Sequence, residues 1–147
     1  MTRDALPSAP DLLQLLTRAE RLMSRRCTAI LGAQGCSLDA WRVLTLLSDG
    51  AGRPMTDVAE QTFLPPGTLT KLVDQLVDDN LVYRRVDDLD RRRIRAYLTP
   101  RGRRLHERIS RELAASLTEL ATAGADRELL AALLVRLVDT LTATPVG

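Results

Sequence analysis

The stretch of residues 82–99, VYRRVDDLDRRRIRAYLT, constrains the fold of this chain more than any other feature. Two short runs of β-prone residues, Leu81–Val86 and Ile94–Thr99, flank a polar segment, a pattern that predicts a β-hairpin. The expected tip carries three aspartates and then three arginines: Asp87, Asp88, Asp90, Arg91, Arg92 and Arg93. Guanidinium groups stay ionised and are costly to bury without a partner, so the tip must lie in solvent or against a polyanion.

The positive charge of the chain is concentrated in one third of its length. Residues 80–111 hold eleven arginines and four acidic residues, whereas the whole chain has a formal net charge of only +2. Concentrated charge attracts a polyanion more strongly than the total suggests. Charge alone leaves open a solvated arginine-rich helix face.

The composition indicates one globular domain over residues 1–147, with 45% hydrophobic and 27% charged residues. Aromatic residues make up only 3%, which favours a mainly α fold. No apolar run is long enough to span a bilayer, and the N-terminus has no apolar signal core, so we expect a cytoplasmic protein without a membrane partner.

Apolar periodicity and capping residues predict the order of the elements. A flexible arm over residues 1–10 is followed by a long helix from Asp11 to Leu31. Ser37 and Thr56 are expected N-caps, Asn80 an expected left-handed helix end, and Thr99-Pro100 the start of another long helix. The remaining expected elements are helices Leu38–Ser48, Asp57–Thr62, Gly67–Asp79 and Asp126–Thr142, and a very short strand at Pro54-Met55.

The first and last helices have apolar surfaces broader than one contact requires. Self-association is the simplest way to cover them, and two-fold symmetry is its commonest form. We therefore expect residues 1–36 and 100–147 to dimerise, and residues 37–99 to form a separate lobe.

In that lobe two helices joined by a short turn precede the hairpin, the order of a winged helix–turn–helix. The second helix, Gly67–Asp79, can enter a major groove, where threonine, lysine and glutamine side chains read base edges or phosphates. The expected DNA-binding residues are Gly67, Thr68, Thr70, Lys71, Asp74, Gln75, Arg84, Asp90, Arg91, Arg92 and Arg93.

These residues resemble the MarR family of bacterial transcriptional regulators. The family wing reads D-x-R, a strand and then L-T-x-x-G, and this chain reads Asp90-Arg91-Arg92, IRAY and Leu98-Thr99-Pro100-Arg101-Gly102. The segment PGTLTKLVDQLVDDNLVYR is similar to the family's recognition helix, and LDAWRVLTLL to its second helix.

The resemblance implies a homodimeric regulator on a pseudo-palindromic operator, most simply a repressor relieved by a small phenolic or aromatic-acid ligand. It implies that Arg92 enters a minor groove and that Asp90 orients it, which suits the negative potential of narrow A·T-rich grooves. The ligand-binding candidates are Arg18, Met23, Trp41, Arg42 and His106.

Several alternatives stay open. Cys27 and Cys36 could make the protein a thiol-based redox sensor, with Cys36 in a glycine-bounded loop expected to be the more exposed. The lobe could also bind DNA without sequence preference, or bind protein. No metal-ligand spacing, phosphate loop or nucleophile–base pair is visible, so we expect no cofactor, no metal and no enzymatic activity.

Overall fold

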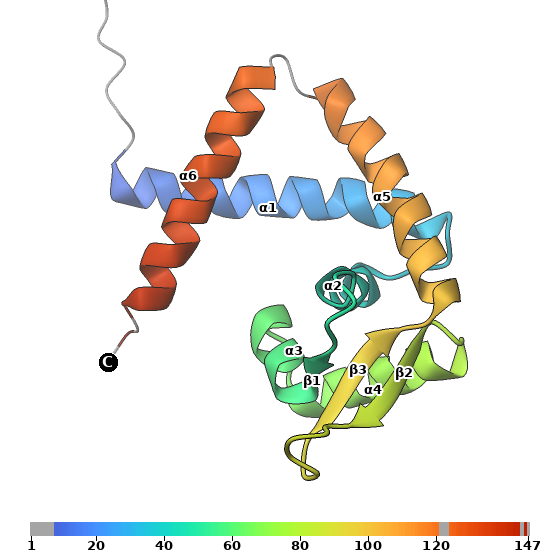
Figure 1. Cartoon of the computed structure of the whole chain (residues 1–147). Helices are drawn as coiled ribbons and strands as arrows, with labels where there is room; N and C mark the ends of the chain where they lie inside the picture. Colours follow the sequence, from blue (N-terminus) through green and yellow to red (C-terminus); the bar gives the residue numbers. More distant parts are fainter. Residues whose placement is uncertain (1–7, 121–123, 145, 147) are drawn as a thin grey trace, which may run out of the picture. The chain divides into compact units, whose positions relative to one another are not determined.

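The computed structural model describes residues 8–120, 124–144 and 146, and in them the chain is mainly α with one small antiparallel sheet. This confirms the expected fold class. The elements are α1 (Ala9–Gly32), α2 (Leu38–Leu46), β1 (Arg53–Pro54), α3 (Met55–Thr62), α4 (Pro66–Asp78), β2 (Val82–Val86), β3 (Ile94–Leu98), α5 (Pro100–Leu120) and α6 (Gly124–Ala143) (Figure 1). The chain divides into two compact units at Ser110, inside α5.

The first helix begins earlier than the sequence pattern predicts. Ser8 is its N-cap and α1 starts at Ala9, because the backbone N–H of Ser8 donates to Asp11 Oδ2 at 3.1 Å. Residues 8–10 are therefore a cap and a first helical turn rather than part of an arm. The rest of the expected arm, residues 1–7, lies outside the described residues.

Thr56 is not the N-cap that the sequence predicts. The helix α3 already begins at Met55, with Pro54 in the cap position and no side-chain capping bond. The reason is that Pro54 belongs to β1 and pairs with Arg95 of β3, so the chain passes directly from strand to helix. The expected short strand at Pro54-Met55 is thus shifted by one residue, and the last helix likewise begins two residues early, at Gly124.

The core of the winged lobe comes from α2, α3, α4 and the sheet. The apolar faces expected on α2 and α4 are confirmed, since Leu44, Leu47, Leu69 and Val73 are fully or almost fully buried. Trp41 is only half-buried and stacks on His106, with ring centroids 4.6 Å apart. The buried side chains of α4 belong to this core, and the polar face of the helix points outward.

The sheet has the order β1-β3-β2, and β2 and β3 form the wing. In their antiparallel register Arg84 lies opposite Ala96 and Tyr83 opposite Tyr97. Ala96 is fully buried, whereas the two tyrosine rings stack at 5.2 Å on the other face. The alternation places Arg84 on the same face as Ala96, toward α4.

The junction between the wing and α5 explains the L-T-x-x-G pattern. Thr99 caps α5 as expected, because its Oγ1 accepts from the N–H of Gly102 at 2.9 Å. The backbone N–H of Thr99 donates to the carbonyl of Leu81 at 3.0 Å. A Cβ at position 102 would collide with that same carbonyl, so only glycine fits there. Asn80 ends α4 with φ 56°, as the sequence predicts.

Candidate nucleic-acid interface

The helix α4 presents one polar face at the surface of the lobe. Pro66 occupies its first turn, where a missing N–H costs nothing, and Phe63 makes the preceding turn with φ 58°. Every residue expected to read DNA from this helix is exposed: Gly67, Thr68, Thr70, Lys71, Asp74 and Gln75. The hydroxyl of Thr70 donates to the Pro66 carbonyl at 2.9 Å, which leaves its oxygen free to accept from a ligand.

An ion pair joins this helix to the wing. The guanidinium of Arg84, on β2, donates to the carboxylate of Asp74, on α4. Both residues were expected to contact DNA, but the structure directs their side chains toward each other. Their ion pair is a polar contact between α4 and β2.

The wing tip is organised around Asp87, which the sequence analysis assigned no role. Asp87 is buried; its Oδ1 accepts from the N–H of Leu89 at 2.8 Å, and its Oδ2 accepts from Arg95 at 2.9 Å. Arg95 also donates to the carbonyl of Gly52, at 3.1 Å, and so ties the tip to the residue before β1. The pKa of Asp87 lies below its usual value. The main cause is the hydrogen bond from the N–H of Leu89, and the hydrogen bond from Arg95 comes second.

Only part of this arrangement can be predicted from the sequence. An aspartate at the start of a turn that accepts from the N–H two residues on is a recurrent pattern, which Asp87 and Leu89 follow. Arg95 and Gly52 are far apart in the chain, and no local pattern pairs them.

Asp90 lies against the arginines that follow it. Its Oδ1 accepts from the N–H of Arg92 at 3.0 Å and lies 3.8 Å from Arg92 Nε, while its Oδ2 lies 3.7 Å from Arg93 Nε. The Arg92 side chain is nevertheless 96% exposed. Leu89 at the same tip is 99% exposed, a second position that the sequence analysis did not single out.

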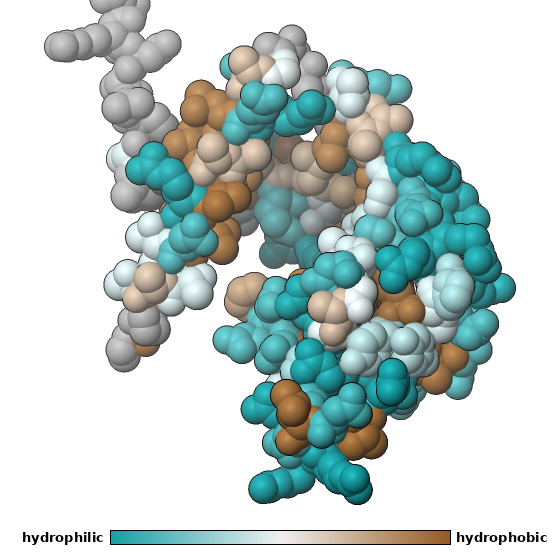
Figure 2. Space-filling view, viewed as in Figure 1, coloured by the Kyte–Doolittle hydropathy of each residue, from teal (hydrophilic) through white to brown (hydrophobic). Residues whose placement is uncertain are grey.

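A groove separates the recognition helix from the wing. It has a volume of about 480 Å³ and is lined by Pro54, Met55, Thr56, Thr70, Asp74, Arg84, Arg92, Arg93 and Ile94. Figure 2 shows mainly hydrophilic side chains over this lower part of the molecule, with a few apolar ones at the wing. Polar α4 residues and wing arginines therefore border one continuous surface.

The expected ligand-binding residues are only partly brought together. Trp41 and Arg42 line a hollow of about 490 Å³ with Thr45, Leu46 and the end of α3, and His106 stacks behind Trp41. Arg18 lines a different hollow along α1, and Met23 lies exposed on that helix. Burial lowers the pKa of His106, which favours its neutral form.

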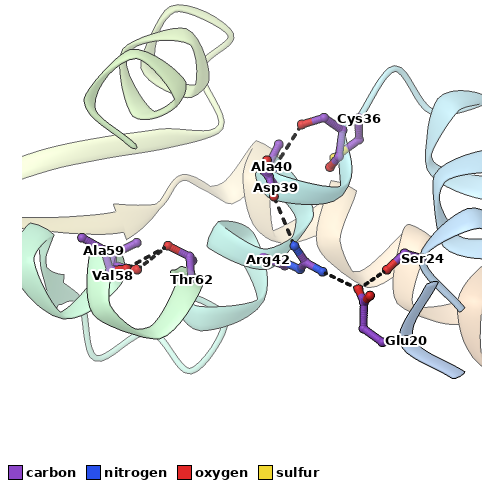
Figure 3. A network of polar contacts seen from close by, with 10 residues as sticks. Glu20, Ser24, Cys36, Asp39, Ala40, Arg42, Val58, Ala59 and Thr62 are labelled. Atoms are coloured by element: carbon purple, nitrogen blue, oxygen red, sulfur yellow. Dashed lines mark hydrogen bonds and ion pairs between the residues drawn. The ribbon is translucent and has the colours of Figure 1, made fainter. Parts of the chain in front are cut away.

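Arg42 is held between two carboxylates (Figure 3). Its Nη1 lies 3.3 Å from Asp39 Oδ1, and its Nη2 lies 3.6 Å from Glu20 Oε1 on α1. Ser24 donates to the same Glu20 oxygen at 2.6 Å. The charge of Arg42 is therefore partly neutralised before any ligand arrives.

Cys36 is not the exposed thiol that its loop suggests. Both cysteines are half-buried, and Cys36 packs against the core of the lobe. Its thiol donates to the Ser37 carbonyl at 3.4 Å, and burial raises its pKa. Both effects disfavour the reactive thiolate.

The structure defines a class of protein. A short helix, a turn, a second helix with an exposed polar face and an arginine-tipped hairpin together make a winged helix–turn–helix. Within the described ranges no cluster of three His, Cys, Asp or Glu could hold a metal ion. None of the described helices has the length and apolar character needed to cross a bilayer.

Comparison with known proteins places the chain within that class. Residues 34–93 match the model of the MarR family. The MarR family transcriptional regulator SPO1453 from Silicibacter pomeroyi DSS-3 is 32% identical, with a TM-score of 0.76 over 88% of this chain and 94% of that one. The chain belongs to the MarR family of transcriptional regulators.

Two further relatives extend the comparison. The HTH-type transcriptional regulator MhqR of Bacillus subtilis is 26% identical over 117 residues, which cover 80% of this chain and 81% of that protein. The structure of NadR in complex with 4-hydroxyphenylacetate is 24% identical, with a TM-score of 0.76 over 93% and 97% of the two chains. MhqR is a transcriptional regulator by name, and NadR supports the fold alone.

Proposed function

We propose that this protein is a homodimeric, sequence-specific repressor that binds a pseudo-palindromic operator and is released by a small aromatic acid. The observation that carries the proposal is the continuous surface formed by the polar face of α4 and the arginines of the wing. One lobe of this kind reads one half-site, so a two-fold dimer reads two.

Dimerisation is supported by the terminal helices. Leu12, Leu13, Leu15 and Leu22 are exposed on α1, and α6 exposes leucines and valines along its whole length. Figure 2 shows brown, apolar side chains over α6. Apolar patches of this extent are uncommon on monomers, and the same faces of a second copy would cover them.

DNA reading is divided between two elements in this proposal. Thr68, Lys71 and Gln75 of α4 contact base edges and phosphates in the major groove. Arg92 enters the adjacent minor groove, with Asp90 fixing its backbone and limiting its rotamers. Asp74 and Arg84 act as positioning residues through their ion pair, and Leu89 contacts the sugar edges at the tip.

Release by a ligand is supported by the hollow beside Trp41. An aromatic acid fits a site that offers an indole ring and a guanidinium, and NadR, with the same fold, is known in complex with 4-hydroxyphenylacetate. Because Arg42 is already paired with Asp39 and Glu20, a carboxylate ligand would have to compete with them. Competition of this kind would move α1 relative to α2 and so alter the half-site spacing.

The experiment begins with selection of binding sites from random duplexes, followed by anisotropy titrations of the selected site over a series of salt concentrations. Arg92→Ala is expected to weaken binding by roughly tenfold to a hundredfold, because a desolvated charged contact is worth about 1.5–3 kcal/mol. It should also lower the salt slope by about one. Gln75→Ala should instead relax preference at one base pair.

Arg21→Gln is the matched control, since this α1 arginine is exposed and lies away from the wing. If the selection returns no common motif while binding stays strong, the protein binds DNA without sequence preference. If Arg92→Ala and Gln75→Ala both bind like the unmodified protein, the proposed reading surface is wrong.

A further inference from the structure

A second basic surface lies away from the wing, at the beginning of α5. Arg101, Arg104 and Arg108 follow one another at helical spacings of three and four residues, so they share one face. They line a cavity of about 400 Å³. Hydrophilic side chains cover this part of α5 on the right of Figure 2.

Segments from three parts of the chain join α5 in building the cavity. The α1–α2 turn contributes Gln34 and Gly35, the end of α4 contributes Asp79, and Leu81, just before β2, also lines the cavity. Arg108 Nε donates to Gln34 Oε1 at 3.1 Å, which directs this guanidinium toward the turn. The site is therefore assembled by the fold and not only by one helix.

The charges in the cavity are poorly balanced. Within the part of the chain that the structure describes, the side chains of Arg101 and Arg104 form no ion pair or hydrogen bond, and Arg108 contacts only a neutral amide. Asp79 is the one carboxylate among the lining residues. Like charges at this spacing repel each other, and an anion between them would remove the repulsion.

The cavity is distinct from the groove between α4 and the wing, because the two share no lining residue, although Gln75 approaches it by donating to Asp79 Oδ1 at 3.2 Å. It lies at the C-terminal end of α4, and a helix of this length separates it by about 20 Å from the base-reading N-terminus. Along β3 the strand alone separates it from the wing tip by about 17 Å. A small molecule suits a hollow of this volume better than a duplex backbone does.

We infer that Arg101, Arg104 and Arg108, with Gln34, form a binding site for a small multivalent oxyanion such as a phosphate ester or a polycarboxylate. Guanidinium groups bind both kinds of oxyanion with paired hydrogen bonds. The bound anion bridges α5 to the α1–α2 turn and lies beside the segment that joins α4 to the wing. The site is separate from the aromatic hollow beside Trp41 and does not depend on the proposed operator binding.

The test uses the full chain without DNA. Inorganic pyrophosphate and citrate are titrated by calorimetry, and backbone amide shifts locate the contact. We expect shifts at Gly35, Asp79 and Leu81, and affinity at least about tenfold lower in Arg104→Gln/Arg108→Gln, because two charged hydrogen-bonding groups are lost. Citrate binding there identifies a polycarboxylate site, and pyrophosphate binding without citrate binding identifies a phosphate site.

Two further variants test whether the anion binds in this cavity. Asp79→Asn removes the competing carboxylate and should tighten pyrophosphate binding severalfold, whereas Arg21→Gln should change nothing. The proposal is overturned if neither anion shifts the cavity amides, or if the double variant binds pyrophosphate as tightly as the unmodified protein. It is also overturned if that variant loses only duplex affinity, because the arginines would then be DNA contacts.

Discussion

The winged lobe and the helix α6 both contain many apolar side chains but bury them very differently. In the lobe Val43, Leu44, Leu47 and Val58 have no exposed surface. In α6, Leu129, Leu133, Val138 and Leu141 are each at least half exposed, and none of its described residues is buried. The lobe completes its core within one chain, whereas α6 needs another surface to cover it.

The difference follows from how each pattern is arranged. On α2 and α4 the apolar residues form one stripe, which the neighbouring elements cover. On α6 they are spread around the helix, as in Leu129, Leu130, Leu133 and Leu134, so one neighbour cannot cover all of them. Substitutions inside the lobe should therefore affect its own stability or its DNA binding, whereas substitutions on α6 should affect dimerisation.

The largest effect is expected from charges on α6. Leu133→Glu with Val138→Glu should raise the dimer dissociation constant by a hundredfold or more, because burying two unpaired carboxylates costs several kcal/mol. Sedimentation velocity measures the dissociation constant. The helical circular dichroism signal should be retained, because the lobe stays folded. Leu89→Glu is the control, since Leu89 is equally apolar and almost fully exposed on the wing. A dimer that survives the double change would move the interface away from α6.

The next largest effect is expected at the junction between the wing and α5. Gly102→Ala should lower the free energy of unfolding by about 1–3 kcal/mol, because the new Cβ collides with the Leu81 carbonyl. Denaturant titration measures the loss. Gly67→Ala is the matched control: nothing lies near an added Cβ there, and alanine favours a helix by up to about 1 kcal/mol. Equal effects at the two positions would contradict the close approach.

A smaller effect is expected at the wing tip. Asp87→Asn keeps the turn but removes the charge that faces Arg95, so duplex affinity should fall by several fold while the dimer is unchanged. Asp88→Asn, a neighbouring exposed aspartate, should bind DNA normally.

The same variant has a pH signature. Because the pKa of Asp87 lies below its usual 3.8, the carboxylate stabilises the folded wing above about pH 4, and this contribution is lost as the pH falls through the lowered pKa. The difference in Tm between Asp87→Asn and the unmodified protein should therefore be constant near neutral pH and disappear in acid. A difference that persists at the lowest pH would assign the effect to packing.

The smallest effect concerns His106. Burial holds its pKa below 6.5, and Glu107 opposes that shift. The unfolded chain then binds more protons than the folded lobe just below pH 6.5, so stability should decline as the pH falls toward the lowered pKa. His106→Phe keeps the stack on Trp41 and should flatten this part of the stability profile, measured as Tm between pH 5 and pH 7.5. An unchanged slope would mean that other groups titrate there.

Local patterns in the sequence were sufficient for features that depend on near neighbours. Thr99 and Pro100 mark the start of α5, and Asn80 ends α4, because caps and left-handed turns need only a few residues. The wing could be predicted from two β-prone runs around a polar tip. Where a distant strand intervenes the local rule fails: Pro54 pairs with Arg95, so α3 starts at Met55 rather than after Thr56.

Only the tertiary structure decided which polar groups meet. The Asp87–Arg95–Gly52 network, the Asp74–Arg84 pair and the stack of Trp41 on His106 each join separate elements. Sequence periodicity shows which face of an element is outward, but it carries no information on which outward groups the packing brings within 4 Å of each other. The residue types and their faces were therefore determined by the sequence, and their partners by the packing of the lobe.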